Sequence, residues 1–397
     1  MSEKNSAFPP FISTGDPGSF AQYTMTLRLP AILDSVIADN EISGPEKQLL
    51  LSLKHEIQGG YIDEVRIDLN LFETEEREVW QQCLTDYGGK PWGAVPWYVA
   101  EALFYFRLLV AFGYFDGGSS FYGKDPFEGA KRRELFSRRG GLEAARRIGV
   151  NRSLKELVFF SLWGNRIDLS RYDVVSAGGR RFERNDTEKL IIDHSERLTE
   201  KIRHAERIDV VTDNGGTELV CDLALARQLL ECEDQKTVHF HMKKHPIYVS
   251  DATVRDAGII IEAMRKYSDP LTRELGERLA CFTEQGRLLM HHHYFWNSPL
   301  HFPDFTPDLS AALGMSDIVM LKGDVNYRRL LSDRRWPHRT RMEEVTHYFP
   351  ATFAVLRTLK SEIAVDLDDE TVSSLSQTDP EWMVNGERGI IRVVEHS

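Results

Sequence analysis

The chain has 397 residues, of which 42% are hydrophobic and 28% are charged, as in an ordinary globular protein. This length allows two domains, or one large domain with an appended one. The net charge of −12 argues against broad binding to nucleic acid or to an anionic membrane, because both require a basic surface. An anionic small molecule is not excluded, since a local cluster of cations can outweigh the overall field.

The cysteines and the N-terminus indicate a cytoplasmic protein. The four cysteines are widely spaced and form no CxxC pair, which is typical of reduced thiols. The first residues are polar and lack the apolar region of a secretory signal. The most apolar window, residues 95–115, contains Glu101 and Arg107, and each would cost roughly 2.5–3.5 kcal/mol at the centre of a bilayer. We therefore expect a buried helix there and no membrane span.

The first half of the chain is predicted to be mostly helical. Apolar residues recur at helical spacing over 23–39 and 46–58, and residues 95–112 are apolar on nearly all sides. A further helix is expected over 154–163, where Gly164 provides a stop. A charged helix is expected over 186–206, after an exposed loop at 177–181. We interpret residues 1–206 as a helical region that packs on the remainder as a cap or wall.

From residue 208 the pattern changes to short apolar runs that alternate with amphipathic stretches. The predicted strands are 208–211, 238–242, 318–321, 353–356 and 390–394, and the predicted helices between the early strands are 217–230 and 252–266. This alternation predicts an α/β fold with a mainly parallel or mixed sheet that helices cover on both faces. We assign this α/β domain to residues 207–397.

Two of the predicted strands end in polar side chains that suggest one functional site. Asp213 and Asn214 follow the strand at 208–211, and Lys322, Gly323 and Asp324 follow the strand at 318–321. In open α/β sheets, ligands bind at the carboxyl ends of the strands. Carboxylate and amide oxygens with nearby cations suit a hard divalent metal and a phosphorylated small molecule.

Asp213 and Asn214 could both reach one metal ion if the glycines that follow let the backbone turn sharply. The same residue types are also typical of a turn and a helix N-cap, so both interpretations remain open for this segment. Asp251 follows another apolar run and could supply a third oxygen ligand. It also suits the cap of the helix at 252–266, and the two roles do not exclude each other.

The segment that begins at Lys322 is the strongest candidate for phosphate binding. Lys322 and Arg328 could neutralise phosphate oxygens, and Gly323 lets the backbone approach a ligand closely. Asp324 could hold a metal-bound water or accept a proton. The alternative is a polar loop whose aromatic and arginine side chains simply pack down.

Other motifs are weaker or point away from common folds. Arg357 and Lys360 form a second cationic strand end, a pattern that is also common on ordinary surfaces. The adjacent histidines 291–293 cannot all face one metal, and His239 and His241 share one face of a strand, which could serve a metal. Structural histidines are the simpler explanation for both sets. No GxGxxG or Walker A pattern follows a strand, and Gly215 occupies the position where a haloacid dehalogenase phosphatase requires a second acid.

These segments resemble the metal-dependent damage-control phosphatase family, specifically its branch with an Arg-Thr-x-Lys motif. The resemblance spans most of the chain, and the motifs have the expected order and approximate spacing. They are Gly18-Ser-Phe-Ala, Leu27-Arg-Leu-Pro-Ala-Ile-Leu, Leu162-Trp-Gly-Asn-Arg-Ile-Asp-Leu-Ser170, Asp213-Asn214 with Glu218, Phe295-Trp-Asn-Ser-Pro299, Lys322-Gly-Asp-Val-Asn-Tyr-Arg328 and Arg357-Thr-Leu-Lys360.

The resemblance implies a helical N-terminal region packed against an α/β/α sandwich that carries the site. It assigns Asp213, Asn214 and Asp251 to a divalent metal, for which manganese, cobalt, nickel and magnesium are candidates. It implies that Asp324 and Lys360 are catalytic. The residues that it implies around the substrate are Glu218, Lys322, Asp324, Asn326, Tyr327, Arg328, Arg357 and Lys360.

We therefore expect a metal-dependent phosphatase that hydrolyses phosphomonoesters of small metabolites such as sugar phosphates, for example fructose phosphates, in metabolite damage control. The metal would polarise a phosphate oxygen, and Lys360, with Lys322 or Arg328, would offset the charge that grows on the phosphoryl group. Asp324 would orient or deprotonate the attacking water, and Asn326 would position an oxygen. One alternative, also described for the family, is an S-adenosylmethionine-dependent methyltransferase that acts on protein glutamates. Another is a noncatalytic sugar-phosphate sensor.

Overall fold

The computed structural model describes residues 8–63, 67–138, 140–148, 152–164 and 188–396. Its centre is a seven-stranded sheet with the strand order β1-β7-β6-β5-β2-β3-β4. Neighbouring strands are parallel, except that β6 and β7 are antiparallel. The strands are β1 (Leu190–Asp193), β2 (Arg207–Val211), β3 (Thr237–Lys243), β4 (Leu288–His293), β5 (Ile318–Lys322), β6 (Phe353–Thr358) and β7 (Gly389–Val394). The predicted mainly parallel, mixed sheet is confirmed.

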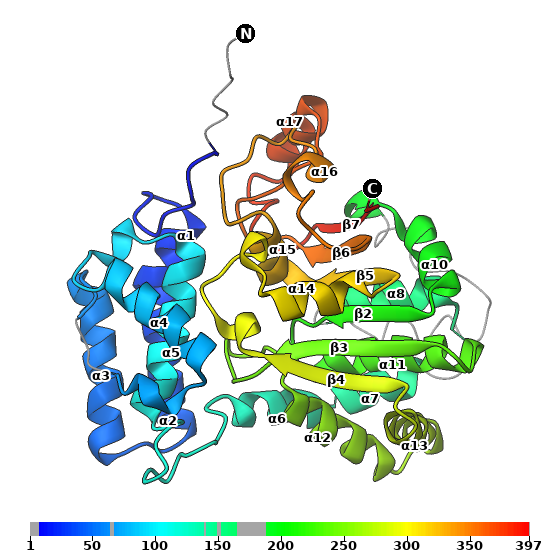
Figure 1. Ribbon diagram of the computed structural model, residues 1–397, viewed down its shortest axis with the longest axis horizontal. Coiled ribbons are helices and arrows are strands. Elements are labelled where there is room, and N and C mark those ends of the chain that lie inside the picture. Colours follow the sequence, from blue (N-terminus) through cyan, green and yellow to red (C-terminus); the bar gives the residue numbers. More distant parts are fainter. Residues whose placement is uncertain (1–7, 64–66, 139, 149–151, 165–187, 397) are drawn as a thin grey trace.

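Helices cover both faces of the sheet, and a further group of helices forms the N-terminal region beside it (Figure 1). The helices of that region are α1 (Phe20–Tyr23), a π-helical turn (Thr24–Arg28), α2 (Leu29–Asp39), α3 (Gly44–Gly59), α4 (Thr74–Tyr87) and α5 (Trp97–Phe112). The later helices are α6 (Glu128–Phe136), α7 (Gly141–Ile148), α8 (Leu154–Trp163), α10 (Ser195–His204), α11 (Gly216–Cys232), α12 (Val254–Arg265), α13 (Pro270–Glu284), α14 (Pro307–Gly314), α15 (Gly323–Leu330), α16 (Met342–Val345) and α17 (Asp369–Thr378). The α/β/α sandwich preceded by a helical region is therefore confirmed.

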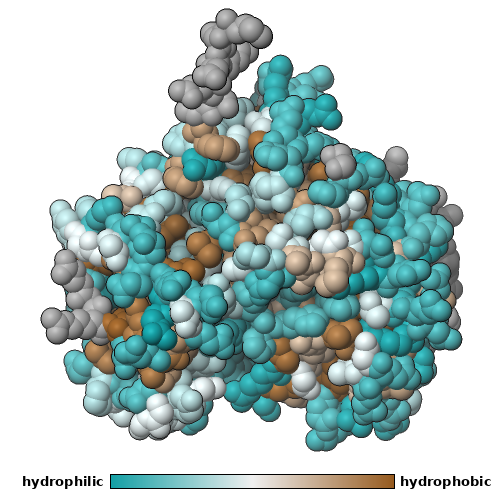
Figure 2. Space-filling view, in the orientation of Figure 1, coloured by the Kyte–Doolittle hydropathy of each residue, from teal (hydrophilic) through white to brown (hydrophobic). Residues whose placement is uncertain are grey.

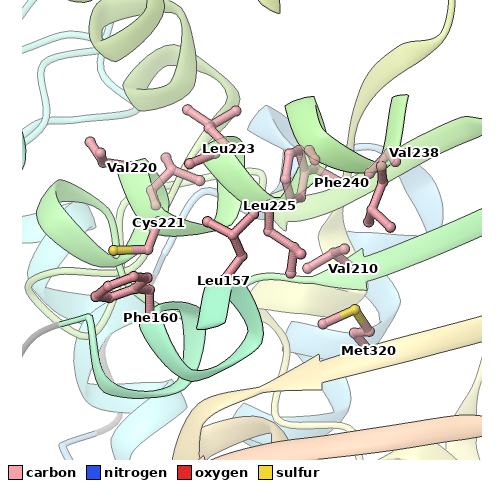
Figure 3. Packing of buried hydrophobic residues seen from close by; sticks show 14 of the residues in the cluster. Leu157, Phe160, Val210, Val220, Cys221, Leu223, Leu225, Val238, Phe240 and Met320 are labelled. Atoms are coloured by element: carbon pink, nitrogen blue, oxygen red, sulfur yellow. The ribbon is translucent and has the colours of Figure 1, made fainter. Parts of the chain in front are cut away.

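Both faces of the sheet bury apolar side chains. Successive residues of a strand point to opposite sides, so an apolar run supplies side chains to both faces. In β5, Ile318 and Met320 join one core while Val319 and Leu321 join the other. The first core contains side chains from α7, α8, α11, α12 and α13, and Figure 3 shows Phe160 of α8 packed beside residues of α11. The second core contains side chains from α14 and α15. Burial on both sides explains why β5 and β6 are continuous rather than alternating apolar runs.

The N-terminal helices have a separate core built around α5, which is buried on nearly every side. The two charges of α5 are paired inside the protein: Arg107 with Glu56, and Glu101 with Arg328 of α15. The second pair links this region to the sheet domain. In the described ranges, no helix is long and apolar enough to cross a membrane. The face drawn in Figure 2 is largely hydrophilic, with apolar atoms confined to hollows and small patches.

Two sequence predictions of secondary structure need correction. The charged helix expected over 186–206 begins only at Ser195, because Leu190–Asp193 form β1, which pairs in parallel with β7. The helix expected over 23–39 contains a π-helical turn at Thr24–Arg28, just before Pro30, whose missing N–H cannot donate to the preceding turn. Strand β4 was not predicted from the sequence, because its second half consists of three histidines.

The division of the chain at residue 206 remains a prediction. Helices α6, α7 and α8 precede that residue, yet α7 and α8 pack against α11 and share its core. The expected loop at 177–181 and the motif residues 165–170 lie outside the described residues.

Candidate functional site

The predicted site residues follow four adjacent strands at one edge of the sheet. Strands β3, β2, β5 and β6 are neighbours and run parallel, so their carboxyl ends meet. The chain proceeds from β2 outward to β3 and β4, and then returns to the other side of β2 to form β5. The gap between β2 and β5 is therefore a topological switch point, where open α/β sheets bind ligands. Asp213 lies just beyond β2 on one side of this gap, and Asp324 follows β5 on the other.

The structure brings the three predicted metal ligands together. Asn214 and Asp251 form an isolated backbone bridge, and Ala252 N donates to Asp213 O at 2.9 Å. Asn214 Nδ2 donates to Asp213 Oδ2 at 2.8 Å and to Glu218 Oε2 at 2.9 Å. These bonds place three carboxyl groups and one amide in one small volume, and each of these side chains is at least nine-tenths buried.

The electrostatics of this group favour an added cation. Burial raises the pKa of Asp213 well above its usual value, and the nearby charges of Glu218 and Asp251 raise it further. Burial also raises the pKa of Asp251, to about 6, although Lys243 opposes this change. Lys243 Nζ lies 3.3 Å from Asp251 Oδ2, but that oxygen accepts no hydrogen bond. The carboxyl groups are therefore only partly neutralised by the protein itself.

Asp324 is held rigidly and is ionised. Its Oδ1 accepts hydrogen bonds from Arg357 Nε at 2.7 Å and from the backbone N of Lys360 at 3.0 Å. Burial alone would raise the pKa of Asp324, but Arg357 and Arg328 together hold it below the usual value. The remaining nitrogens of Arg357 donate to Ile363 O and to Ser361, and its guanidinium lies 4.0 Å from the Tyr327 ring centroid. Arg357 thus fixes the position of the Asp324 carboxylate.

Lys322 and Arg328, predicted to contact phosphate, have their donors engaged in buried ion pairs. Lys322 Nζ donates to Ser161 O at 2.6 Å, Glu218 Oε1 at 3.0 Å and Asp222 Oδ1 at 2.9 Å. Arg328 bonds to Glu101 and Asp333, and its guanidinium lies 3.5 Å from the Trp97 ring centroid. Both side chains are almost completely buried. A direct phosphate contact would require these bonds to break.

Of three other predicted residues, Asn326 and Tyr327 are buried and Lys360 is exposed. Asn326 is fully buried; its Nδ2 donates to Thr212 O and Lys322 O, whereas its Oδ1 has no donor. The Tyr327 hydroxyl accepts from Val365 N at 3.2 Å, which makes it part of the packing. Lys360 is exposed, so its ammonium is free to reach a ligand in the gap.

The structure adds residues that sequence reasoning missed. Lys243 ends β3 and pairs with Asp251, so the rule that polar residues at strand ends form the site could have identified it. Ser250 Oγ donates to Asn214 Oδ1 at 2.5 Å. Lys131, from α6, donates to Asp251 O at 2.9 Å, and Glu134 Oε1 accepts from Thr217 N at 2.9 Å. No local motif marks these two, because they come from a helix distant in sequence. Lys243 also lines a cavity of about 100 Å³ together with Thr253 and Arg255.

Gly323 permits the close approach of β5 to Asp213. Its φ is +81°, and a Cβ there would lie 2.1 Å from the Asp213 carboxyl group. We predict that Gly323→Ala displaces Asp213 and lowers the free energy of unfolding by about 1–3 kcal/mol. Turnover should fall by more than unfolding of part of the protein would explain, because the displaced carboxylate belongs to the proposed metal site. Urea unfolding and a phosphate-release assay measure the two effects. Gly314→Ala, where a Cβ meets Pro350 at an ordinary 3.7 Å, is the control and is expected to retain activity.

In the described part of the chain, no group of three or more His, Cys, Asp or Glu side chains is placed to hold a metal ion. The predicted set of Asp213, Asn214 and Asp251 contains only two such residues, because its third member is an amide. The residues cluster as predicted, and their roles as ligands remain a prediction.

Comparison with known proteins decides the family. A family model described as the damage-control phosphatase ARMT1-like domain matches residues 24–375. The chain belongs to this family. Membership in the ARMT1-like family agrees with the resemblance found in the motifs, and it assigns the chain to a family of phosphatases.

Full-length relatives in the ARMT1-like family support the same assignment. The damage-control phosphatase ARMT1 of Mus musculus is 29% identical and that of Danio rerio is 30% identical; each alignment covers 97% of this chain, with 98% and 96% of the respective relative. The Homo sapiens protein of the same name is 29% identical over 97% of this chain and 98% of its own length. A crystal structure of a DUF89 family protein from Pyrococcus horikoshii has a TM-score of 0.49 at 16% identity, over 93% of this chain and 96% of that one.

Proposed function

We propose that this ARMT1-like protein is a metal-dependent phosphatase that hydrolyses phosphomonoesters of small metabolites, with sugar phosphates such as fructose phosphates as its substrates. The observation that carries the proposal is the group of Asp213, Asn214, Glu218 and Asp251 at the switch point of the sheet, whose charges are only partly neutralised. The family to which the chain belongs supports phosphate ester hydrolysis as the reaction.

The residues present fit a hard divalent cation. Asp213 and Asp251 supply carboxylate oxygens, and Asn214 supplies an amide oxygen. Asp251 Oδ2 is buried without a hydrogen-bond donor, and Asp213 is destabilised by its acidic neighbours, so a cation would satisfy both. Asn214 currently turns its NH₂ group towards Asp213, and rotation of the amide by 180° would present its oxygen instead. Oxygen ligands of this kind select poorly among manganese, cobalt, nickel and magnesium.

When bound, the ion would supply Lewis-acid polarisation of a phosphate oxygen and a lowered pKa for water. The chain supplies the remaining chemistry. Lys360, the exposed cation of the site, pairs with the phosphoryl oxygens as charge develops on them. Asp324 accepts a hydrogen bond from the attacking water and fixes its direction, because Arg357 and the Lys360 backbone hold the carboxylate in place. The low pKa of Asp324 suits this orienting role better than that of a strong base.

The test is phosphate release from a panel of sugar phosphates, using chelator-treated protein with single metals added back. We expect no release without metal and recovery with manganese, cobalt, nickel or magnesium, to different extents. Release that persists in the presence of chelator would refute the metal dependence. If no substrate is hydrolysed with any metal, the phosphatase proposal fails, and S-adenosylmethionine binding then tests the methyltransferase alternative against a sugar-phosphate sensor.

The cysteines and the net charge of the chain support a proposed location and a proposed partner. The four cysteines are all free thiols, which supports a cytoplasmic location. The net charge of −12 supports a partner that is a small phosphorylated molecule and gives no basis for nucleic-acid or membrane binding.

A further inference from the structure

A second candidate metal site lies on β3 and β4, away from the switch point. His239 and His241 belong to β3, and His291 belongs to the neighbouring strand β4, where it is paired in register with His241. The three side chains share one face of the sheet, because the alternate residues Val238, Phe240 and Met242 join the core on the opposite face. The sequence separates these histidines into two motifs, and the parallel pairing of β3 with β4 brings them together.

His239 and His291 are in direct contact. His239 Nδ1 lies 3.0 Å from His291 Nε2, and the two rings are stacked at an interplanar angle of 19°. Two neutral imidazoles at this distance share one proton, so one nitrogen donates and the other accepts. Both side chains are only partly buried, which leaves the pair open to ions from solution.

His241 is not available to this pair. Its Nε2 bonds to Asp209 Oδ1 at 2.6 Å, and Asp209 also accepts from Ser316 Oγ and Arg207 Nε. These bonds fix His241 as a structural residue beneath the pair. A site here is therefore limited to two imidazoles, which agrees with the absence of any three-ligand group among the described residues.

The surroundings of the pair favour neutral imidazoles, which are the form that binds metals. Burial lowers the pKa of His239 to about 4, and the nearby Arg207, His291 and His241 lower it further against the opposing charge of Asp209. Burial likewise lowers the pKa of His291. Both rings are therefore neutral at pH 7, and metal binding requires the shared proton to move to the other nitrogen of its own ring.

We propose that His239 Nδ1 and His291 Nε2 form a two-imidazole binding site for a late first-row divalent cation, Cu²⁺ or Ni²⁺ in preference to Mg²⁺ or Mn²⁺. With metal–nitrogen bonds of about 2.0 Å, two ligands are about 2.8 Å apart at 90° and about 3.3 Å apart at a tetrahedral angle. The observed 3.0 Å lies between these values, so the separation of the two nitrogens fits a shared ion once the rings turn both lone pairs towards it. Imidazole suits copper and nickel, whereas magnesium and manganese prefer oxygen. Water would complete the coordination shell.

This site is distinct from the proposed phosphatase centre. His239 precedes Lys243, the end of β3, by four residues, which corresponds to about 13 Å along a strand. The inference does not rest on the proposed function, but it affects how that function is tested. Nickel added to the phosphatase assay would occupy both places, whereas magnesium would occupy only the oxygen site.

Calorimetric titration with Cu²⁺ in the presence of excess Mg²⁺ tests the proposal, because Mg²⁺ fills the oxygen site without competing for imidazole. We expect the native protein to bind a Cu²⁺ ion that His239→Ala and His291→Ala each bind roughly tenfold more weakly or worse. Electron paramagnetic resonance should show two nitrogen donors in the native protein and fewer in either variant. His239→Gln and His291→Gln keep a polar side chain and guard against loss of folding, which circular dichroism monitors.

His292→Ala is the matched control. His292 is exposed on the same strand, and its side chain alternates to the other face of β4. We expect this variant to bind Cu²⁺ as the native protein does, and all of these variants to keep manganese-dependent phosphate release. If His292→Ala weakens Cu²⁺ binding as much as His239→Ala does, or if neither member of the pair affects it, the proposal is overturned and the contact is a hydrogen bond only.

Discussion

Asp213→Asn will lower phosphate release by at least about 100-fold and yet raise the stability of the metal-free protein. The loss of activity follows because the substitution removes a carboxylate from the proposed metal site. The gain in stability follows because Asp213 is buried beside Glu218 and Asp251, and these neighbours make its charge unfavourable. Asparagine is neutral and of nearly the same volume, so it relieves this repulsion by about 1 kcal/mol or more.

Two measurements check this expectation together. Thermal unfolding of chelator-treated protein should give a higher midpoint for the variant, and added manganese should stabilise the native protein more than the variant. Asp234→Asn, at a fully exposed carboxylate, serves as the control for removing one negative charge and should leave activity and stability unchanged. A variant that is inactive but less stable would mean that Asp213 supports the fold and would remove the argument for a cation. A variant with near-native turnover would refute the metal assignment.

Lys322→Met will destabilise the protein by about 3–5 kcal/mol, which is the expected cost of breaking a buried ion pair from one side. Lys322 is fully buried, and its ammonium binds both Glu218 and Asp222. The paired carboxylates raise the pKa of Lys322 despite its burial, so it is charged. Removing this cation takes the positive charge away from two buried carboxylates, and burial already raises the pKa of Asp222.

Urea unfolding measures this effect, and two further variants define its origin. Lys322→Met combined with Asp222→Asn should regain part of the lost stability, because the second change removes one unpaired charge. Lys155→Met breaks an exposed pair with Glu196 and should cost less than about 1 kcal/mol. A Lys322→Met protein that unfolds like the native protein but binds substrate poorly would instead support the phosphate contact predicted from the sequence.

The strands of the sheet could largely be read from the sequence. Two of the five predicted strands, 318–321 and 353–356, are continuous apolar runs that need no tertiary information to be recognised. The other three are short apolar runs with one or two polar residues inside them. The polar residues after them, Asp213 and Asp324, could be predicted as a site by the general rule for strand ends. Strand β4 could not be predicted, because its histidines carry no apolar pattern and its pairing with β3 depends on distant residues.

The sequence alone was enough to place Asp213 and Asn214 at the carboxyl end of a strand, where ligands bind in a parallel sheet. Asp251 lies eight residues after the end of β3, and its isolated bridge with Asn214 brings it to the same place. Only the tertiary structure decided which groups the lysine and arginine side chains of the site bind. Lys322 and Arg328 look like phosphate ligands in the sequence, but both face buried carboxylates supplied by α11, α5 and the turn after α15. A charged side chain is directed by the charges around it in space, and these come from segments whose proximity no local pattern records.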